Sequence, residues 1–336
     1  MKNILITGGA GYIGSHICIE LLNANYNPII IDNFSNSSEK VIKRIEKITQ
    51  TKIKFFKCNL GDKKKLIDII KFFNCEAVLH LSGRKSVNES TNKPLLYYFN
   101  NVSETISLLE AMIATSLKKI IFSSSATIYG KPKNLPISEN HPLSPENVYG
   151  ETKLIIENML KNVFNSDKAW KICILRYFNP VGAHESGLIG DNPQNIPNNI
   201  MPYICQVAIG KREKLKIWGN DYDTIDGTGI RDYIHVVDLA KGHIKALEKL
   251  QTFDFTEINL GTGRGYSVLQ LINSFEKVTR KNINFEFKER RIGDIDINYA
   301  NPQKAKNLLD WEAQFDIDRM CEDSWRWQIM NPEGLN

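Results

Sequence analysis

The chain has 336 residues, of which 42% are hydrophobic and 24% are charged. This composition excludes disordered, collagen-like and fibrous classes, and the length predicts about two domains. The formal net charge is +5, but eleven Lys and Arg residues and only three acidic residues fall within residues 40–71. These cations are spaced among apolar residues at helix and strand periods, which favours a solvated outer face over a nucleic-acid or membrane patch.

The six cysteines form no CxxC pair and show no metal-ligand spacing with the six histidines. We therefore expect reduced thiols and no metal. The N-terminal residues enter a strand pattern at once and break at Gly8, too early for a signal peptide. The sequence has no apolar run of about 18 residues, the length a membrane span needs. These features predict a cytoplasmic protein without a membrane partner.

In chain order, short apolar runs alternate with longer amphipathic segments through the first half of the sequence. Strands are expected at residues 4–7, 28–31, 53–56, 77–81, 120–123 and 172–177. Helices are expected near residues 11–24, 38–49, 62–73, 95–116 and 148–164, where apolar residues recur at i, i+3 and i+4. This alternation implies right-handed crossovers and a parallel sheet covered on both faces. The sequence therefore predicts a doubly wound α/β domain.

The alternation fails after Asn179 and Pro180. Residues 180–235 are rich in glycine and proline, which is typical of loops. We therefore expect a first domain over residues 1–179 and a smaller α/β domain over residues 180–336, with one strand near 256–260 returning to the first sheet.

The first expected strand ends in a glycine-rich turn. Gly8, Gly11 and Gly14 separate this strand from an apolar helix. Their spacing allows a tight turn, close approach of a pyrophosphate and close packing of helix on strand. Asp32 ends the second strand, 18 residues after Gly14, where a carboxylate accepts hydrogen bonds from a ribose 2′-hydroxyl and repels a 2′-phosphate. The pattern predicts a Rossmann domain that binds NAD rather than NADP.

A second glycine cluster occupies residues 261–265, before a helix expected to start at Ser267. Its spacing is GxGxG, and Glu286, the acidic residue at a suitable distance, lies inside an alternating strand instead of at the end of a buried one. We interpret the cluster as a strand-to-helix loop and not as a second nucleotide site.

A tyrosine beside a lysine can take a proton from a hydroxyl, because the cation favours the phenolate and lowers the pKa of tyrosine below about 10. Tyr-x-x-x-Lys spacing places both side chains on one helical face. Of the two occurrences, Tyr129 to Lys133 contains glycine and proline, whereas Tyr149 and Lys153 open an amphipathic helix. Chance alone predicts about one Tyr-x-x-x-Lys pair in such a sequence. The assignment of Tyr149 and Lys153 as a proton-transfer pair therefore depends on the glycine turn that precedes them.

The strand expected at residues 120–123 leads into three serines, Ser123 to Ser125. Because strand carboxyl ends border the ligand crevice of a doubly wound sheet, we expect these hydroxyls to face cofactor and substrate; a polar strand cap is the alternative. Ser125 is the candidate for a hydroxyl that bonds the reacting group and relays its proton.

These residues together resemble the extended short-chain dehydrogenase/reductase family, and within it the UDP-hexose 4-epimerases. The resemblance extends over nearly the whole chain and rests on residues 7–16, 32–33, 123–130, 149–153, 176–184, 196–203 and 226–235. It implies a homodimer that holds NAD tightly and interconverts UDP-glucose and UDP-galactose. In such enzymes carbon 4 of the hexose is oxidised, the 4-keto sugar turns over in the pocket, and the hydride returns to its other face.

The resemblance also implies roles for single residues, with Tyr149 as base, Lys153 on the nicotinamide ribose and Ser125 beside them. Cofactor contacts are expected at Gly8, Gly11, Tyr12, Ile13, Gly14, Asp32, Asn33, Asn36, Ser37, Asn59, Leu60, Leu81, Ser82, Gly83, Lys85, Asn100, Ser123, Tyr149, Lys153, Tyr177 and Phe178. UDP-sugar contacts are expected at Ser125, Tyr149, Asn179, Asn199, Ile200, Lys216, Trp218, Arg231, Arg291, Asp294 and Asn298. Arginine suits a diphosphate through forked, charge-assisted hydrogen bonds, although an isolated arginine more often makes a surface salt bridge.

Three places depart from the family pattern. Asn59 replaces an acidic residue near the adenine, and retention of NAD is the property this change would alter. Residues 81–85 read Leu-Ser-Gly-Arg-Lys in place of Phe-Ala-Gly-Leu-Lys, but keep Gly83 and Lys85. Asn298 stands where a bulky tyrosine restricts the pocket to plain hexoses. We therefore hypothesise a side activity on UDP-N-acetylglucosamine and UDP-N-acetylgalactosamine.

Two other functions remain open at this point. A nucleotide-sugar 4,6-dehydratase shares the glycine turn and the Tyr-Lys pair, but Ala126 and Thr127 stand where its relatives carry Asp-Glu. An NAD-sensing binding protein would need neither Tyr149 nor Lys153. Helices near 95–116 and 148–164 are the expected contact between the two protomers, and no nucleic acid is expected as a partner.

Overall fold

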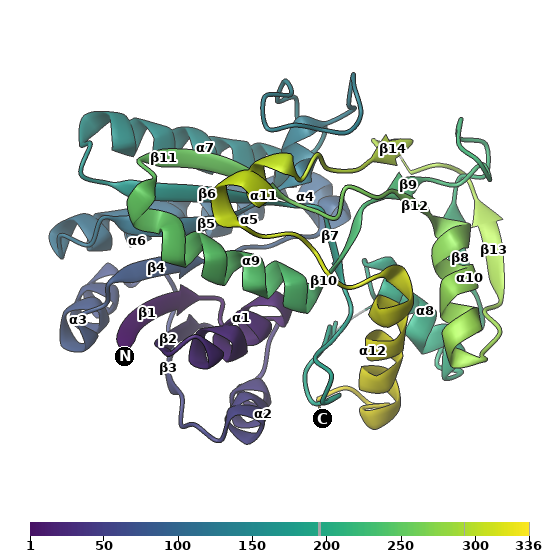
Figure 1. The fold of residues 1–336 in the computed structure, drawn as a ribbon, viewed down its shortest axis with the longest axis horizontal. Coiled ribbons are helices and arrows are strands. Elements are labelled where there is room, and N and C mark those ends of the chain that lie inside the picture. Colours follow the sequence, from purple (N-terminus) through teal and green to yellow (C-terminus); the bar gives the residue numbers. More distant parts are fainter. Residues whose placement is uncertain (194–195, 292, 336) are drawn as a thin grey trace.

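A seven-stranded parallel sheet forms the larger part of the molecule (Figure 1). The structure, a computed structural model, describes residues 1–193, 196–291 and 293–335. The strands of the sheet are β1 (Lys2–Thr7), β2 (Tyr26–Asp32), β3 (Lys54–Lys57), β4 (Ala77–His80), β5 (Lys119–Ser125), β6 (Lys171–Tyr177) and β11 (Phe255–Leu260). Their order is β11-β6-β5-β4-β1-β2-β3, so the chain reverses its direction of progress between β1 and β4. The doubly wound α/β class is confirmed.

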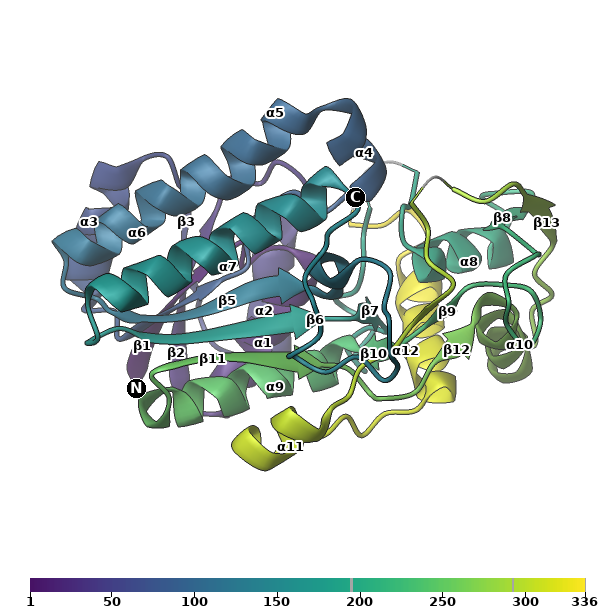
Figure 2. The ribbon, with the colours of Figure 1, turned by 90° about the horizontal axis from the view of Figure 1, so that it is seen from above.

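Helices cover both faces of this sheet because successive strand side chains point to opposite faces. Ile4 and Ile6 of β1 belong to one apolar core, and Leu5 between them belongs to the other. The first core is completed by α1 (Tyr12–Asn23), α2 (Glu39–Thr49), α9 (Val236–Lys249) and α11 (Gln303–Leu309). The second is completed by α3 (Lys63–Phe73), α6 (Glu104–Ala114) and α7 (Val148–Ser166) (Figure 2).

The helix expected near residues 95–116 is composite. It follows α4 (Val87–Asn92) and consists of α5 (Pro94–Tyr97), a π-helical stretch (Tyr98–Ser103) and α6. The pair Tyr129 to Lys133 is not helical: a short turn over Ala126–Tyr129 ends at Gly130, whose φ is 61°. This conformation favours glycine and stops the helix before the lysine.

The second part of the chain forms small sheets around a separate apolar core. Its strands are β7 (Asn179–Val181), β8 (Leu215–Trp218), β9 (Ile230–Arg231), β10 (Tyr233–His235), β12 (Tyr266–Ser267), β13 (Phe285–Lys288) and β14 (Ile297–Asn298). Its helices are α8 (Ile200–Ala208), α10 (Val268–Thr279) and α12 (Ile317–Met330). A short helical turn at Leu250–Thr252 follows α9 directly, and its Leu250 belongs to the core of the first sheet. The boundary near residue 179 stays a prediction, since α9 packs on α1 and β11 pairs with β6 in the first sheet.

The second glycine cluster is a loop, as the sequence indicated. The carboxylate of Asp232 accepts hydrogen bonds from the backbone amides of Thr262 at 2.8 Å and Gly263 at 2.9 Å. Ser267 and Gln270 then form a capping box at the start of α10. These amides already have an acceptor, so the loop offers no phosphate site. Among the described residues, no helix is both long and apolar enough to cross a membrane.

A buried ion pair fixes α7 on the sheet. Glu157 and Arg176 have side chains that are 5% and 3% exposed, and Oε2 lies 2.7 Å from Nη2. Ser124 donates to the other carboxylate oxygen at 2.5 Å, and Arg176 donates to the Tyr129 hydroxyl at 3.0 Å. The charges therefore have partners on β5, β6 and α7 together.

We predict that Glu157→Ala lowers the free energy of unfolding by about 3–5 kcal/mol, because Arg176 is left charged and buried without its partner. Urea denaturation measures the loss. Asp254→Ala is the matched control: it breaks the Lys171–Asp254 pair, in which the aspartate is 71% exposed, and should cost at most about 1 kcal/mol. Equal losses in the two variants would contradict the prediction.

Candidate active site

A cleft of about 410 Å³ lies at the carboxyl ends of β1, β2, β4 and β5. This is where the strand order reverses and where doubly wound sheets bind their ligands. The cleft contains most of the cofactor residues expected from the sequence. Those that line it are Gly8, Gly11, Tyr12, Ile13, Gly14, Asp32, Asn33, Asn36, Ser37, Leu60, Leu81, Ser82, Gly83, Lys85, Asn100 and Ser123.

The glycine turn brings backbone against backbone. A Cβ at Gly14 would lie 2.3 Å from the carbonyl oxygen of Gly8, and Gly8 itself has a φ of 73°. Gly11 caps α1 without a side chain, so the first amides of the helix remain available at the wall of the cleft. The bare helix N-terminus fits the pyrophosphate of a dinucleotide.

Asp32 is held in a fixed orientation at the end of β2. Its Oδ1 accepts hydrogen bonds from the Phe34 amide at 2.8 Å and the Ser37 hydroxyl at 2.9 Å, and its Oδ2 accepts from the Ala10 amide at 3.0 Å. Oriented in this way, the carboxylate fits the hydroxyls of an adenosine ribose.

Five expected cofactor residues do not line the cleft: Asn59, Tyr149, Lys153, Tyr177 and Phe178. Asn59 is exposed and accepts a hydrogen bond from Asn33 at 2.9 Å. Tyr177 and Phe178 are each 6% exposed and belong to apolar cores beneath the cleft.

Tyr149, Lys153 and Ser125 come together where α7 starts over the end of β5. The Lys153 Nζ donates to the Ser123 carbonyl at 2.7 Å and lies 5.9 Å from the centroid of the Tyr149 ring. Ser125 accepts hydrogen bonds from the amide and the hydroxyl of Thr127, at 3.2 and 3.0 Å. A Cβ on Gly83 would lie 3.8 Å from the same Nζ, so the pair borders the cofactor cleft.

Burial dominates the electrostatics of this pair. It raises the pKa of Tyr149 to about 12, while a hydrogen bond with Ser125 acts in the opposite direction. It lowers the pKa of Lys153 to about 8, against the attraction of Glu157. The sequence-based expectation of a tyrosine pKa below 10 is therefore wrong for this structure, because removal from water penalises both charged forms.

Several expected substrate residues meet at the sheets of the second part. Arg231 on β9 is the register partner of Asn298 on β14, and its Nη2 lies 2.5 Å from Oδ1 of Asp294. On β8, Lys216 and Trp218 are exposed, and the guanidinium carbon of Arg291 lies 4.9 Å from the centroid of a Trp218 ring. These side chains bring cations and an aromatic surface together, and a nucleotide diphosphate is a ligand that such groups suit.

The other expected substrate residues lie nearer the cleft. Asn199 and Ile200 are at the start of α8, and Asn199 lines the cleft and donates to Asp191 at 3.1 Å. Asn179 is exposed on β7, and its amide donates to the Asp232 carbonyl at 2.9 Å. Asp232 follows Arg231 directly, so Asn179 and the β9 residues are held close together.

Part of the lining is not predicted by the sequence. Arg84, Glu89 and Tyr97 lie on it, as do the segment 189–193 and Leu335. Arg84 had appeared only as a departure from the family pattern, and the glycine- and proline-rich composition of residues 180–235 predicted loops without placing them. Nothing in the sequence singles out Leu335.

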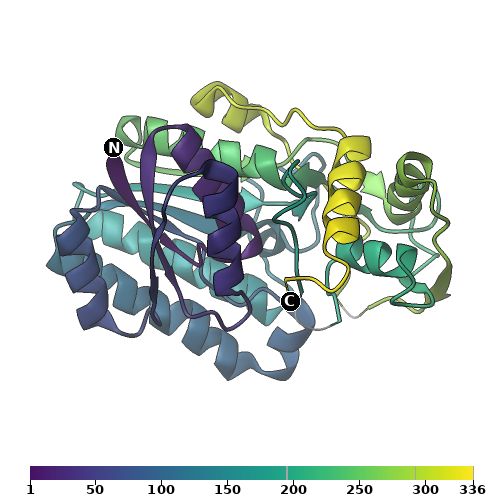
Figure 3. The same cartoon turned by 90° about the horizontal axis from the view of Figure 1, so that it is seen from below.

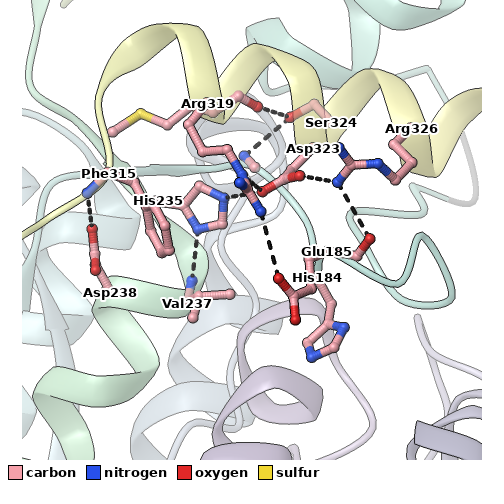
Figure 4. Close-up of polar contacts among 12 residues, drawn as sticks. His184, Glu185, His235, Val237, Asp238, Phe315, Arg319, Asp323, Ser324 and Arg326 are labelled. Carbon is pink, nitrogen blue, oxygen red and sulfur yellow. Dashed lines mark hydrogen bonds and ion pairs between the residues drawn. The ribbon is translucent and has the colours of Figure 1, made fainter.

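Polar contacts connect the second part to the first behind the cleft. Tyr12 of α1 donates from its hydroxyl to the Gly182 carbonyl at 2.7 Å, and Ser324 of α12 accepts a hydrogen bond from the Gly182 amide at 3.1 Å. The buried carboxylate of Asp323 on the same helix accepts from His235, Arg319 and Arg326 (Figure 4). Helix α12 therefore holds the ends of β7 and β10 together.

Comparison with known proteins agrees with this geometry. A family model described as GDP-mannose 4,6 dehydratase matches residues 5–324. The UDP-glucose 4-epimerase of Bacillus subtilis (strain 168) is 52% identical over 332 residues, 98% of each chain. The chain belongs to the UDP-glucose 4-epimerase family. Within the described residues, no group of three or more His, Cys, Asp and Glu side chains is arranged to hold a metal ion.

Solved structures of this family have the same fold. A UDP-glucose 4-epimerase from Bifidobacterium longum in complex with NAD⁺ and UDP is 47% identical, with a TM-score of 0.97 over 99% of this chain and 100% of that one. Another from Stenotrophomonas maltophila, with bound NAD and formylated UDP-arabinopyranose, is 42% identical, with a TM-score of 0.97 over 99% of both chains. The epimerase resemblance expected from the sequence is confirmed.

The lowered pKa of Lys153 predicts a pH-dependent stability. Between pH 8 and 10.5 the unfolded chain binds a proton that the folded chain does not, so the free energy of unfolding rises with pH. Lys153→Met should remove the cost of burying this charge. The free energy of unfolding of Lys153→Met should exceed that of the wild type by up to about 3 kcal/mol at pH 7 and by about half as much at pH 9.5.

Urea denaturation at the two pH values, at matched nucleotide content, measures this difference. Lys161→Met removes an exposed lysine from the same helix and serves as the control. A gain in stability that is the same at both pH values would contradict the assigned pKa.

Proposed function

We propose that this protein interconverts UDP-glucose and UDP-galactose with NAD as a tightly bound cofactor. The observation that carries the proposal is the position of the half-buried Tyr149 and the buried Lys153, which border a cleft built for a dinucleotide. Arg231 and Arg291, on the neighbouring sheets, supply cations for a diphosphate. The names and bound ligands of the similar proteins support the same cofactor and substrate class.

The residues of the chain divide the work between proton transfer and binding. Tyr149 accepts the proton of the hexose 4-hydroxyl, Ser125 holds the reacting oxygen, and Lys153 holds the nicotinamide ribose. When bound, NAD⁺ supplies an acceptor for the hydride that leaves carbon 4 of the hexose, and a positive charge that favours the phenolate of Tyr149. The Tyr149 hydroxyl returns the proton when the 4-keto sugar is reduced on its other face.

Epimerisation needs a firm hold on UDP and a loose hold on the sugar. The diphosphate is the natural partner of Arg231, whose guanidinium is now paired with Asp294 and is 18% exposed. Forked hydrogen bonds from a guanidinium fix a phosphate strongly. The sugar meets the smaller polar groups of Ser125 and Asn298, which permits rotation of the 4-keto intermediate without release.

The dehydratase alternative is not favoured, although the matching family model carries that description. Loss of water across carbons 5 and 6 needs an acid and a base beyond the Tyr-Lys pair. In the turn Ala126–Tyr129, position 126 is an alanine and the Thr127 hydroxyl donates to Ser125. Neither position offers a carboxylate, so the turn lacks the groups that the elimination requires.

The deciding experiment adds UDP-galactose to the purified protein without external NAD and measures UDP-glucose by chromatography. We expect net conversion, because the bound cofactor is regenerated in each cycle. Tyr149→Phe should lose about 10²- to 10⁴-fold in turnover, as it removes the proton acceptor. Tyr26→Phe, at the start of β2, is the matched control and should behave as wild type. A requirement for stoichiometric NAD would overturn the proposal.

We extend the proposal to UDP-N-acetylhexosamines as a side activity. Asn298 is 6% exposed, and its Oδ1 has no hydrogen-bond partner among the described residues. It lies beside Arg231, and its side chain is much smaller than tyrosine. We predict turnover of UDP-N-acetylglucosamine by the wild type and a loss of roughly 10- to 200-fold in Asn298→Tyr, relative to UDP-glucose. A coupled assay measures turnover of both substrates. The absence of wild-type turnover at saturating UDP-N-acetylglucosamine would contradict this extension.

We also propose a homodimer formed through α5, α6 and α7. Phe99, Ile106 and Ile113 are seven residues apart and 61%, 44% and 57% exposed, which is an apolar stripe that a second helix pair would cover. Phe99→Glu should shift the protein to a monomer in analytical ultracentrifugation. Phe72→Glu, on α3 and 82% exposed, is the control that should leave the mass unchanged. A dimer that persists in Phe99→Glu would contradict this interface.

The proposed location is the cytoplasm. All six cysteines are free and buried, and burial raises the pKa of Cys75 to about 12. Such thiols suit a reducing compartment, where no disulfide is needed to hold the fold.

A further inference from the structure

The cofactor cleft is lined by distant parts of the chain. Ser37 lines it from the segment that enters α2, and Val41 lines it from the first turn of α2 itself. Ile189 lines it from the loop after β7, and Leu335 from the segment that follows α12. Val41, Ile189 and Leu335 belong to one apolar core. In the view from below, the segment after α12 ends between the purple α2 and the yellow α12 (Figure 3).

Arg44, on α2, joins these two walls. Its Nη1 donates hydrogen bonds to the Leu188 carbonyl at 2.8 Å and to the side-chain oxygen of Asn331. Its guanidinium carbon lies 5.6 Å from the centroid of the Trp327 ring. Asn331 in turn donates to the Gly187 carbonyl at 2.9 Å. One side chain therefore holds both the loop and the segment after α12 against α2.

Arg44 differs from the other cations of its helix. Lys40, Lys43 and Lys47 are exposed, in agreement with the solvated face expected for residues 40–71. Arg44 is half-buried, and burial lowers its pKa. A guanidinium withdrawn from water is stabilised by charge-assisted hydrogen bonds and by the face of an indole ring, and Arg44 has both.

We propose that Arg44 is a latch that closes the cofactor cleft and sets the rate at which bound NAD leaves. The inference rests on the proposed function, which supplies the cofactor. A nucleotide in the cleft is enclosed between Val41 on one wall and Ile189 and Leu335 on the other, so it leaves when the walls separate. Separation breaks both hydrogen bonds of Arg44. The residue touches no reacting atom and acts as a positioning residue.

The test uses the full chain with the NAD that it carries after purification. Released NAD is captured by excess alcohol dehydrogenase and ethanol, which convert it to fluorescent NADH and prevent rebinding. We expect Arg44→Met to release NAD about tenfold faster than the wild type, the ratio expected for the loss of a hydrogen bond to a charged group. Arg44→Lys should be intermediate, because an ammonium keeps the charge but not the planar, multidentate geometry.

Lys47→Met is the matched control, since it removes one charge from the same helix and no contact between the walls. It should release NAD at the wild-type rate. Added NAD should raise the turnover of Arg44→Met more than that of the wild type. A merely structural role would lower the melting temperature of Arg44→Met and leave the release rate unchanged.

Equal release from Arg44→Met and the wild type would overturn the latch and leave the proposed cofactor intact. A wild-type protein that carries no NAD and takes up none would overturn the cofactor proposal instead. If circular dichroism shows that Arg44→Met does not fold, Leu335→Ala serves as the second variant. It opens the other wall and should also speed release, and an unchanged rate in this variant would overturn the latch.

Discussion

The buried polar face of α7 is the constraint on which the rest of the structure depends. Tyr149, Lys153 and Glu157 are spaced four residues apart, so they face the sheet together. Such groups can be buried only if partners satisfy them. The Ser123 carbonyl and the Arg176 guanidinium provide these partners from β5 and β6. The contacts that fix the helix on the sheet are therefore the contacts that place the tyrosine at the cleft.

Features that depend on local spacing could be predicted from the sequence. Residues that are close together in the sequence determine the glycine turn, the order of strands and helices, and the helical position of Tyr149. Their three-dimensional setting could not be predicted in the same way. The direction of the pKa shift of Tyr149 depends on how deeply distant elements bury it, and the effect of burial exceeds that of the hydrogen bond with Ser125.

The walls of the cleft could not be predicted from local spacing either, because they are formed by segments far apart in the sequence. Ile189 and Leu335 line the cofactor cleft, and the loop that carries Ile189 starts at Gly182, which Tyr12 and Ser324 of α12 hold by hydrogen bonds. No periodicity in the sequence reports such tertiary contacts. They also show why a boundary at residue 179 is a simplification, because the cleft is built from both parts of the chain at once. A ligand that orders one wall therefore orders the other.

The packing of α9 on α1 has a consequence for the way the chain is made. Helix α1 leaves the ribosome more than 200 residues before α9, which covers part of its apolar surface. Because synthesis proceeds at about 5–20 residues per second, that apolar surface of α1 stays exposed for on the order of ten seconds or more before α9 is made. The edge of the sheet beside β6 is exposed for a shorter time, because β11 follows about 80 residues later and is made within roughly 4–16 seconds. The nascent chain is therefore a natural client for chaperones that bind exposed apolar segments during translation.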